Sequence, residues 1–237
     1  MNLEGKVAVI TGGEGSLGRV VTKRFLAEGA KVVLGWYTLE DWEETKGLIP
    51  TDYKGQFIDL HVDATKEEQV ENLMKKAKEA FGSIDILLHM VGLFHAGGMI
   101  WETDAAIFEK LLEVNLKSTF LCSKHALKVM LERGRGRIVV FPPKAVLTPG
   151  PPFSAYAISE AGLTTLMSAL REELKETHII VNAIMPSVID TPSTREMPFA
   201  EAEKGVKTLE IADLLCFLCS EESGPVSGSI LKVFGKK

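Results

Sequence analysis

The chain has 237 residues, of which 46% are hydrophobic, and a formal net charge of −5 at pH 7. This length and composition can bury the core of one domain, so we predict a single domain over residues 1–237. The negative charge gives no general attraction to nucleic acid or anionic lipid, and the sequence has neither an apolar signal segment nor a run of 18 apolar residues. We therefore expect a cytoplasmic protein that binds neither nucleic acid nor membranes.

Short apolar runs alternate with longer segments of helical periodicity along the whole chain. Helices are predicted most clearly over 67–81, 105–131 and 154–175. Strands that alternate with helices imply right-handed crossovers and a parallel sheet covered on both faces. The expected fold class is α/β, a doubly wound, Rossmann-like sheet of about seven strands. These strands are predicted at residues 6–10, 31–34, 56–60, 84–91, 137–141, 179–184 and 229–234.

A glycine-rich segment follows the first predicted strand and precedes a helix. It reads Thr11-Gly12-Gly13-Glu14-Gly15-Ser16-Leu17-Gly18. Glycines let the backbone turn tightly and approach a pyrophosphate, which then lies at the positive N-terminus of the helix. A plain strand-to-helix turn could carry the same glycines. The order of strand, glycines and helix favours a dinucleotide site that includes Gly12, Gly13, Gly15, Ser16, Leu17 and Gly18.

Two further clusters have plain structural interpretations. Arg133, Arg135 and Arg137 alternate with glycines, which favours a solvated turn before a strand over an RNA-contacting tract. Cys216 and Cys219 form a C-x-x-C inside an apolar helical run, not at a helix N-terminus, which favours core packing over a redox pair. No second ligand pair accompanies these cysteines, so no metal site is expected.

The motifs resemble those of the short-chain dehydrogenase/reductase family over nearly the whole chain. The segment Thr11 to Gly18 is similar to the family's TGxxxGxG, and the segment from Val181 to Ser187 is similar to its VNAIxPG. The resemblance implies a site for NAD(H) or NADP(H). In that site Asp63 would contact the adenine, Gly92 would be the retained glycine after the fourth strand, and Ile189 and Thr191 would lie by the nicotinamide amide.

The resemblance also implies a catalytic site in which two family residues are replaced. Tyr156 matches the proton-transferring tyrosine, and Asn115 matches the helix asparagine. Glu160 stands in place of the family's lysine and Pro143 in place of its serine, so a hydroxyl donor is lost. A carboxylate near the phenol should raise the pKa of Tyr156. A protonated phenol suits the reduction of a carbonyl rather than the oxidation of an alcohol.

Several side chains near this site keep two interpretations. Glu160 could accept hydrogen bonds from ribose hydroxyls or be an ordinary acid on a helix surface. Lys144 could replace the missing cation, although strand alternation directs it away from Pro143. His89, His95 and His178 are interpreted as packed or exposed histidines and not as general acids.

The end of the second strand governs the choice of cofactor. Trp36 stands where an NAD-preferring member of the family would place an acid, and it could instead fill the adenosine pocket and prevent dinucleotide binding. No arginine stands at Gly15 or Tyr37 to receive a 2′-phosphate. Glu14 would repel that phosphate by about 2 kcal/mol at a separation of roughly 8 Å. The sequence therefore favours NAD(H) over NADP(H), with an unliganded protein as the alternative.

Three hypotheses follow for function. The chain is an oxidoreductase with weakened chemistry that reduces a small carbonyl compound, or a catalytically inactive homologue that binds dinucleotide or acts as a structural subunit. As a third hypothesis, it assembles with an active homologue. The long helices that begin at Ala105 and Ser154 usually pair in this family, so we expect a homo-oligomer, a dimer or a tetramer, or a hetero-oligomer.

Overall fold

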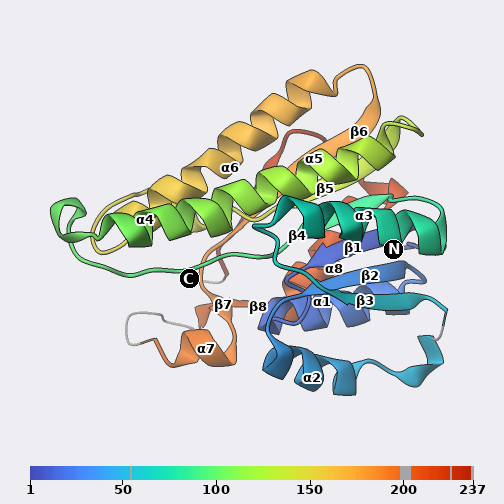
Figure 1. The fold of residues 1–237 in the computed structure, drawn as a ribbon, viewed down its shortest axis with the longest axis horizontal. Helices are drawn as coiled ribbons and strands as arrows, with labels where there is room; N and C mark the ends of the chain where they lie inside the picture. The colour runs from blue at the N-terminus through green and yellow to red at the C-terminus, as the bar shows by residue number, and fades with distance from the viewer. Residues whose placement is uncertain (54, 198–203, 225, 236–237) are drawn as a thin grey trace.

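The computed structural model describes residues 1–53, 55–197, 204–224 and 226–235 (Figure 1). One parallel sheet of seven strands forms its centre, in the order β3-β2-β1-β4-β5-β6-β9. The predicted α/β fold is confirmed, and each predicted strand end lies within two residues of the observed one. The strands are β1 (Val7–Thr11), β2 (Lys31–Trp36), β3 (Phe57–His61), β4 (Ile86–His89), β5 (Arg135–Val140), β6 (His178–Pro186) and β9 (Ile230–Val233).

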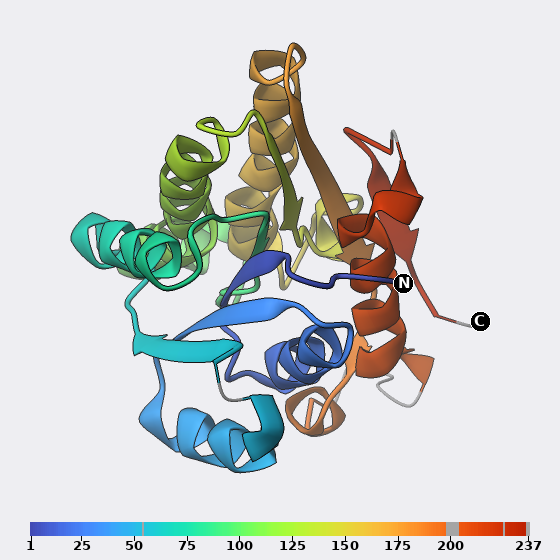
Figure 2. The ribbon, with the colours of Figure 1, turned by 90° about the vertical axis from the view of Figure 1, so that its right-hand side faces the viewer.

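Helices cover both faces of the sheet (Figure 2). Along β1, Val9 faces one hydrophobic cluster and Ile10 the other, because successive strand residues point to opposite faces. This double burial explains why the strand is apolar from Val7 to Ile10. On the Val9 side lie α3 (Glu67–Phe81), α5 (Ser118–Met130) and α6 (Ser154–Glu173); on the Ile10 side lie α1 (Ser16–Ala27), α2 (Leu39–Leu48) and α8 (Thr208–Cys219).

The helix predicted over 105–131 has the expected extent but is not regular. It consists of α4 (Ala105–Leu111), a π-helical turn (Leu112–Lys117) and α5. The turn contains Asn115, and π-helical turns are frequent at functional sites. Hydrophobic periodicity predicts the helix but not this local widening, which inserts one more residue into a single turn.

The interpretation of the arginine-rich segment as a turn before a strand is confirmed for Arg133 and is wrong for Arg135, which is exposed but already belongs to the strand. β5 begins at Arg135, two residues before the predicted strand start at Arg137. Arg137 lies in the strand as predicted, but only 12% of its side chain is exposed, so it is not solvated. Pairing with β6, which begins at Arg135↔His178, extends the strand beyond its apolar residues.

A small two-stranded sheet lies beyond the carboxyl end of β6. It pairs β7 (Ile189–Asp190) with β8 (Val206–Lys207), and α7 (Pro192–Arg195) follows β7. Arg195 donates two hydrogen bonds to Asp190, and Lys207 forms an ion pair with the same carboxylate.

Among the described residues, no helix has the length and apolar character needed to cross a membrane.

Candidate active site

The site lies where the strand order reverses, between β1 and β4. In doubly wound sheets ligands bind at the carboxyl ends of the strands beside such a reversal. The loop from β1 to α1 carries the glycine-rich segment, and the segment after β4 carries Gly92. β1 and β4 are paired from Ala8 to Thr11, so these two loops leave the sheet side by side.

The glycine-rich loop can fold as tightly as it does only because two of its residues have no side chain. Gly12 has a φ of +70°, and a Cβ atom there would lie 3.0 Å from the backbone of Met90. A Cβ atom at Gly18 would lie 2.3 Å from the Gly12 carbonyl oxygen. Helix α1 begins at Ser16 with no side-chain cap, so its first amide groups remain available to an anion. The residues predicted to bind a pyrophosphate therefore lie together in a loop suited to it.

Glu14 has a role that the sequence does not reveal. Its Oε1 atom accepts hydrogen bonds from the amides of Tyr37 at 2.8 Å and Thr38 at 3.4 Å, directly before α2 begins. The side chain is only 7% exposed, and its carbonyl oxygen accepts a hydrogen bond from Thr45. The pairing of β1 with β2 brings these distant residues together. The carboxylate thus uses two amides at the end of β2 that could otherwise receive an anion.

Trp36 is held in an aromatic cluster at the same strand end. Its indole nitrogen donates to Asp59 at 2.9 Å, and its ring stacks on Trp42 at 5.7 Å. The rings of Trp36 and His61 meet edge to face, and the exposed Tyr37 stacks on the same histidine. Trp36 is therefore fixed by contacts with β3 and α2.

The other residues predicted to contact the cofactor follow the carboxyl ends of β3 and β6. Asp63 accepts hydrogen bonds from the amide and hydroxyl of Thr65 at 2.9 and 2.7 Å. Burial by itself would raise the pKa of Asp63, but these bonds outweigh it and lower the pKa below its usual value. Ile189 begins β7, and Thr191 caps α7 through its hydroxyl, which accepts from the amide of Thr194.

Asn115 connects the loop after β4 to helix α6. Its Oδ1 atom accepts from the amide of Leu93 at 2.6 Å, and its Nδ2 atom donates to the Leu93 carbonyl at 3.0 Å. The same Nδ2 atom donates to Ser159 Oγ at 2.9 Å, and Ser159 donates to the carbonyl of Tyr156. Sequence reasoning identified Asn115 but missed Ser159, because no motif marks it.

Glu160 is buried beside Asn115, so its interpretation as a surface acid is wrong. It is 5% exposed, and a Cβ atom placed on Gly92 would lie 4.0 Å from Glu160 Oε1 and 3.9 Å from Asn115 Oδ1. Within the described ranges, nothing donates a hydrogen bond to its carboxyl group or forms an ion pair with it. Burial raises the pKa of Glu160 to about 8. The group is therefore mostly protonated at pH 7, whereas the sequence argument treats it as charged.

The pKa of Tyr156 is raised well above its usual value of 10, in the predicted direction. The main cause is burial of the phenol, and the carboxylate of Glu160 is the second cause. The sequence alone indicates only the second cause. Phe94 packs edge-on against the Tyr156 ring at 5.2 Å and helps to exclude water from it. The phenol is therefore protonated at neutral pH.

Three neighbouring candidates have contacts of their own. Pro143 precedes a short 3₁₀-helix, Lys144–Val146, that contacts α6. The Lys144 ammonium lies 5.0 Å from the ring of Phe234. His89 is buried and hydrogen-bonded on both ring nitrogens, to Thr11 and Ser118, and burial lowers its pKa to about 3. His89 is thus a packed, neutral histidine, as predicted.

The cysteines lie in the core, as predicted. Cys216 and Cys219 are at most 1% exposed in α8, and burial raises the pKa of Cys216 to about 12. Such a thiol has almost no thiolate at neutral pH. In the part of the chain that the structure describes, no three His, Cys, Asp or Glu side chains gather as they would around a metal ion.

Comparison with known proteins agrees with this fold. Residues 6–202 match the family model described as short chain dehydrogenase, and the chain belongs to this family of oxidoreductases. It is 32% identical to the uncharacterized oxidoreductase YxbG of Bacillus subtilis, covering 98% of this chain and 91% of that one. It is 27% identical to the 3-oxoacyl-[acyl-carrier-protein] reductase FabG of Thermotoga maritima, covering 99% and 98% of the two chains. The solved structure of ElxO with NADP bound superimposes with a TM-score of 0.88 at 26% identity, over 97% of each chain.

Proposed function

We propose that the protein is an NAD(H)-dependent reductase of a small carbonyl compound, with slow chemistry. One observation carries this proposal: Tyr156 and Glu160, on the first turns of α6, lie against the segment that follows the carboxyl end of β4, at Phe94 and Gly92, and burial keeps both groups protonated at pH 7. A protonated phenol can donate to a carbonyl oxygen but cannot act as the base that alcohol oxidation needs.

The described residues fit a nicotinamide dinucleotide. The glycine-rich loop and the free amides of α1 would hold the pyrophosphate, and Glu160 is a buried carboxyl that has no hydrogen-bonding partner within the described ranges and could bind a ribose hydroxyl. When bound, the cofactor supplies the hydride that reduces the carbonyl carbon. ElxO, a relative in fold, is described as binding NADP, which supports a nicotinamide dinucleotide here.

Tyr156 transfers a proton from its Oη atom to the substrate oxygen in this scheme. Asn115 and Ser159 position Tyr156 by fixing the first turns of α6 against the loop after β4. The raised pKa makes the phenol a weak acid, so proton transfer is costly. Pro143 supplies no hydroxyl to polarise the carbonyl. These two features together predict slow turnover.

The preference for NAD(H) rests on Glu14. Its carboxylate occupies the amides of Tyr37 and Thr38 and places negative charge at the end of β2. An anionic 2′-phosphate there would meet a like charge and would find those two donors already used.

The test is reduction of a panel of small ketones and diketones with NADH and NADPH, by the wild type and by Glu160→Lys, Pro143→Ser and the double variant. Lysine would lower the pKa of the phenol and serine would restore a donor. Because groups that act as a unit are non-additive, the double variant should gain more than the product of the single gains. A wild type as fast as the double variant would contradict the picture of a weakened site.

The alternative is an inactive homologue that serves as a structural or dinucleotide-binding subunit. One surface of the molecule favours assembly, either with a second copy of the chain or with an active homologue. Phe120 is 50% exposed beside a hollow of about 950 Å³ that lies between the π-helical turn, α5 and Leu166 of α6. An apolar surface of this kind fits a second copy of the chain or an active homologue. An inert, cofactor-binding double variant would favour this alternative.

A further inference from the structure

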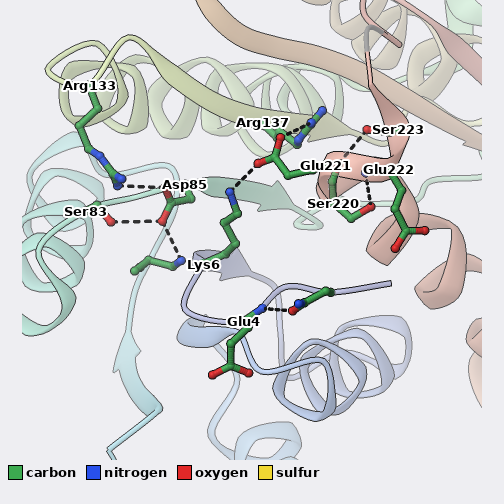
Figure 3. A network of polar contacts seen from close by, with 12 residues as sticks. Glu4, Lys6, Ser83, Asp85, Arg133, Arg137, Ser220, Glu221, Glu222 and Ser223 are labelled. Carbon is green, nitrogen blue, oxygen red and sulfur yellow. Dashed lines mark hydrogen bonds and ion pairs between the residues drawn. The ribbon is translucent and has the colours of Figure 1, made fainter.

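A separate cavity of about 960 Å³ lies at the edge of the sheet opposite the proposed active site. It is formed at the amino ends of β4, β5 and β6 and by the C-terminal part of α6. Its volume falls in the range of sites that hold small molecules. Figure 3 shows the polar network beside it, in which Lys6 and Arg137 point toward Glu221 and Arg133 points toward Asp85.

The cavity carries more positive than negative charge, although the chain as a whole is acidic. Its three acids are Asp85, Glu172 and Glu221. The basic side chains that line it, apart from His178, are Lys6, Arg133, Arg135, Arg137, Arg171 and Lys175.

Asp85 and Glu221 are already engaged. Asp85 accepts from Ser83 at 3.2 Å and from Arg133 at 3.0 Å, and it also bonds the backbone of Val7. Glu221 forms an ion pair with Lys6 at 2.6 Å and a longer one with Arg137 at 3.8 Å. Neither carboxylate has the capacity to neutralise the remaining cations.

Several cationic groups of the cavity therefore have no ion pair or only a long one. The Nη1 atom of Arg137 is buried and has no hydrogen-bond partner. Within the described ranges, no acid lies at ion-pair distance from Arg135 or Lys175, and Arg171 has only Glu172 at 3.9 Å. A buried donor without an acceptor costs free energy, and an anion that accepted from Arg137 would remove that cost.

The geometry gathers these groups from separate segments. Arg135 and Arg137 are two residues apart on β5 and so point to the same face of the sheet. His178 begins β6 and is paired in register with Arg135. Guanidinium groups bind phosphate through parallel hydrogen bonds, which favours phosphate over a monovalent anion.

We propose that this cavity binds a small, multiply charged phosphate compound, such as a diphosphate or an organic phosphate ester. The site is distinct from the glycine-rich loop, which lies at the other edge of the sheet. Its size suits a metabolite, whereas a nucleic acid strand would need a groove along which successive phosphates could bind.

The test is calorimetric titration with inorganic pyrophosphate at constant ionic strength. The cavity variant carries both Arg135→Gln and Lys175→Gln. Both side chains are exposed, and no acid of the described ranges lies at ion-pair distance from either. The control is Lys23→Gln with Lys128→Gln, two exposed lysines away from the cavity that change the net charge equally. We expect pyrophosphate binding that is weakened about tenfold or more in the cavity variant, because charged hydrogen bonds are lost, and is unchanged in the control.

A further variant separates the two phosphate-binding regions. Gly15→Asp places a negative charge at the N-terminus of α1, where a Cβ atom would make only an ordinary contact at 3.5 Å. If Gly15→Asp abolishes pyrophosphate binding and the cavity variant keeps it, pyrophosphate binds at the glycine-rich loop, and the proposal is overturned. Equal weakening in cavity and control variants would also overturn it, as would binding of a short single-stranded RNA without binding of pyrophosphate.

Discussion

Replacing Glu160 by glutamine should stabilise the protein increasingly as the pH rises. The carboxyl has an ordinary pKa of 4.5 and a pKa of about 8 in the folded state, because it is buried. The folded protein therefore holds a proton that the unfolded chain releases between these two values. Stability that depends on this group is fully present below pH 4.5 and is lost as the pH rises through 8. Glutamine has nearly the same shape and does not titrate.

The size of the effect follows from the two pKa values. At about 1.4 kcal/mol for each pKa unit, the difference corresponds to about 5 kcal/mol in total. Between pH 5 and pH 9, the free energy of unfolding of Glu160→Gln should gain about 4 kcal/mol relative to the wild type. The glutamine amide can also change the free energy of unfolding by a constant amount. That amount does not depend on pH, so it does not alter the change in stability between pH 5 and pH 9.

The measurement is denaturant unfolding of both proteins at several pH values between 5 and 9, with bound cofactor absent. The control is Glu173→Gln, which removes an exposed acid from the same helix and should show no such slope. A constant difference between Glu160→Gln and wild type over this range would refute the reasoning, because it would mean that the carboxyl titrates at the same pH in both states.

Three further predictions concern other parts of the molecule. Glu14→Ser should reduce the difference in affinity between NADH and NADPH, because it frees the amides of Tyr37 and Thr38. Calorimetry with both cofactors measures the two dissociation constants, and an unchanged ratio between them would contradict the prediction. Light scattering at micromolar concentration should show a dimer or tetramer that Phe120→Asp dissociates; a monomeric wild type would contradict self-association. Thiol reagents should label Cys122, Cys216 and Cys219 only after unfolding, because burial raises all three thiol pKa values; rapid labelling of the native protein would be the contrary result.

Sequence patterns predict the sheet because its two buried faces require apolar strands. β1 and β4 are buried at every residue, so each is an apolar run up to its last residue, Thr11 or His89, and these two side chains hydrogen-bond to each other. The start of β5 at Arg135 could not be found in this way, since polar residues there are held in the strand by pairing with β6. The π-helical turn around Asn115 likewise has no hydrophobic signature.

For the site, the sequence by itself determined which residue types stand at the matching positions: Tyr156, Asn115, Glu160 and the glycines of the phosphate loop. Only the tertiary structure decided their chemical state. Glu160 is neutral at pH 7 because α6 and the loop after β4 remove it from water, and burial depends on segments distant in sequence. The same holds for Glu14, whose contacts at the end of β2 exist because two strands pair in parallel. Sequence spacing fixes which side chains are available, whereas desolvation and hydrogen bonding across the fold fix which of them carry charge.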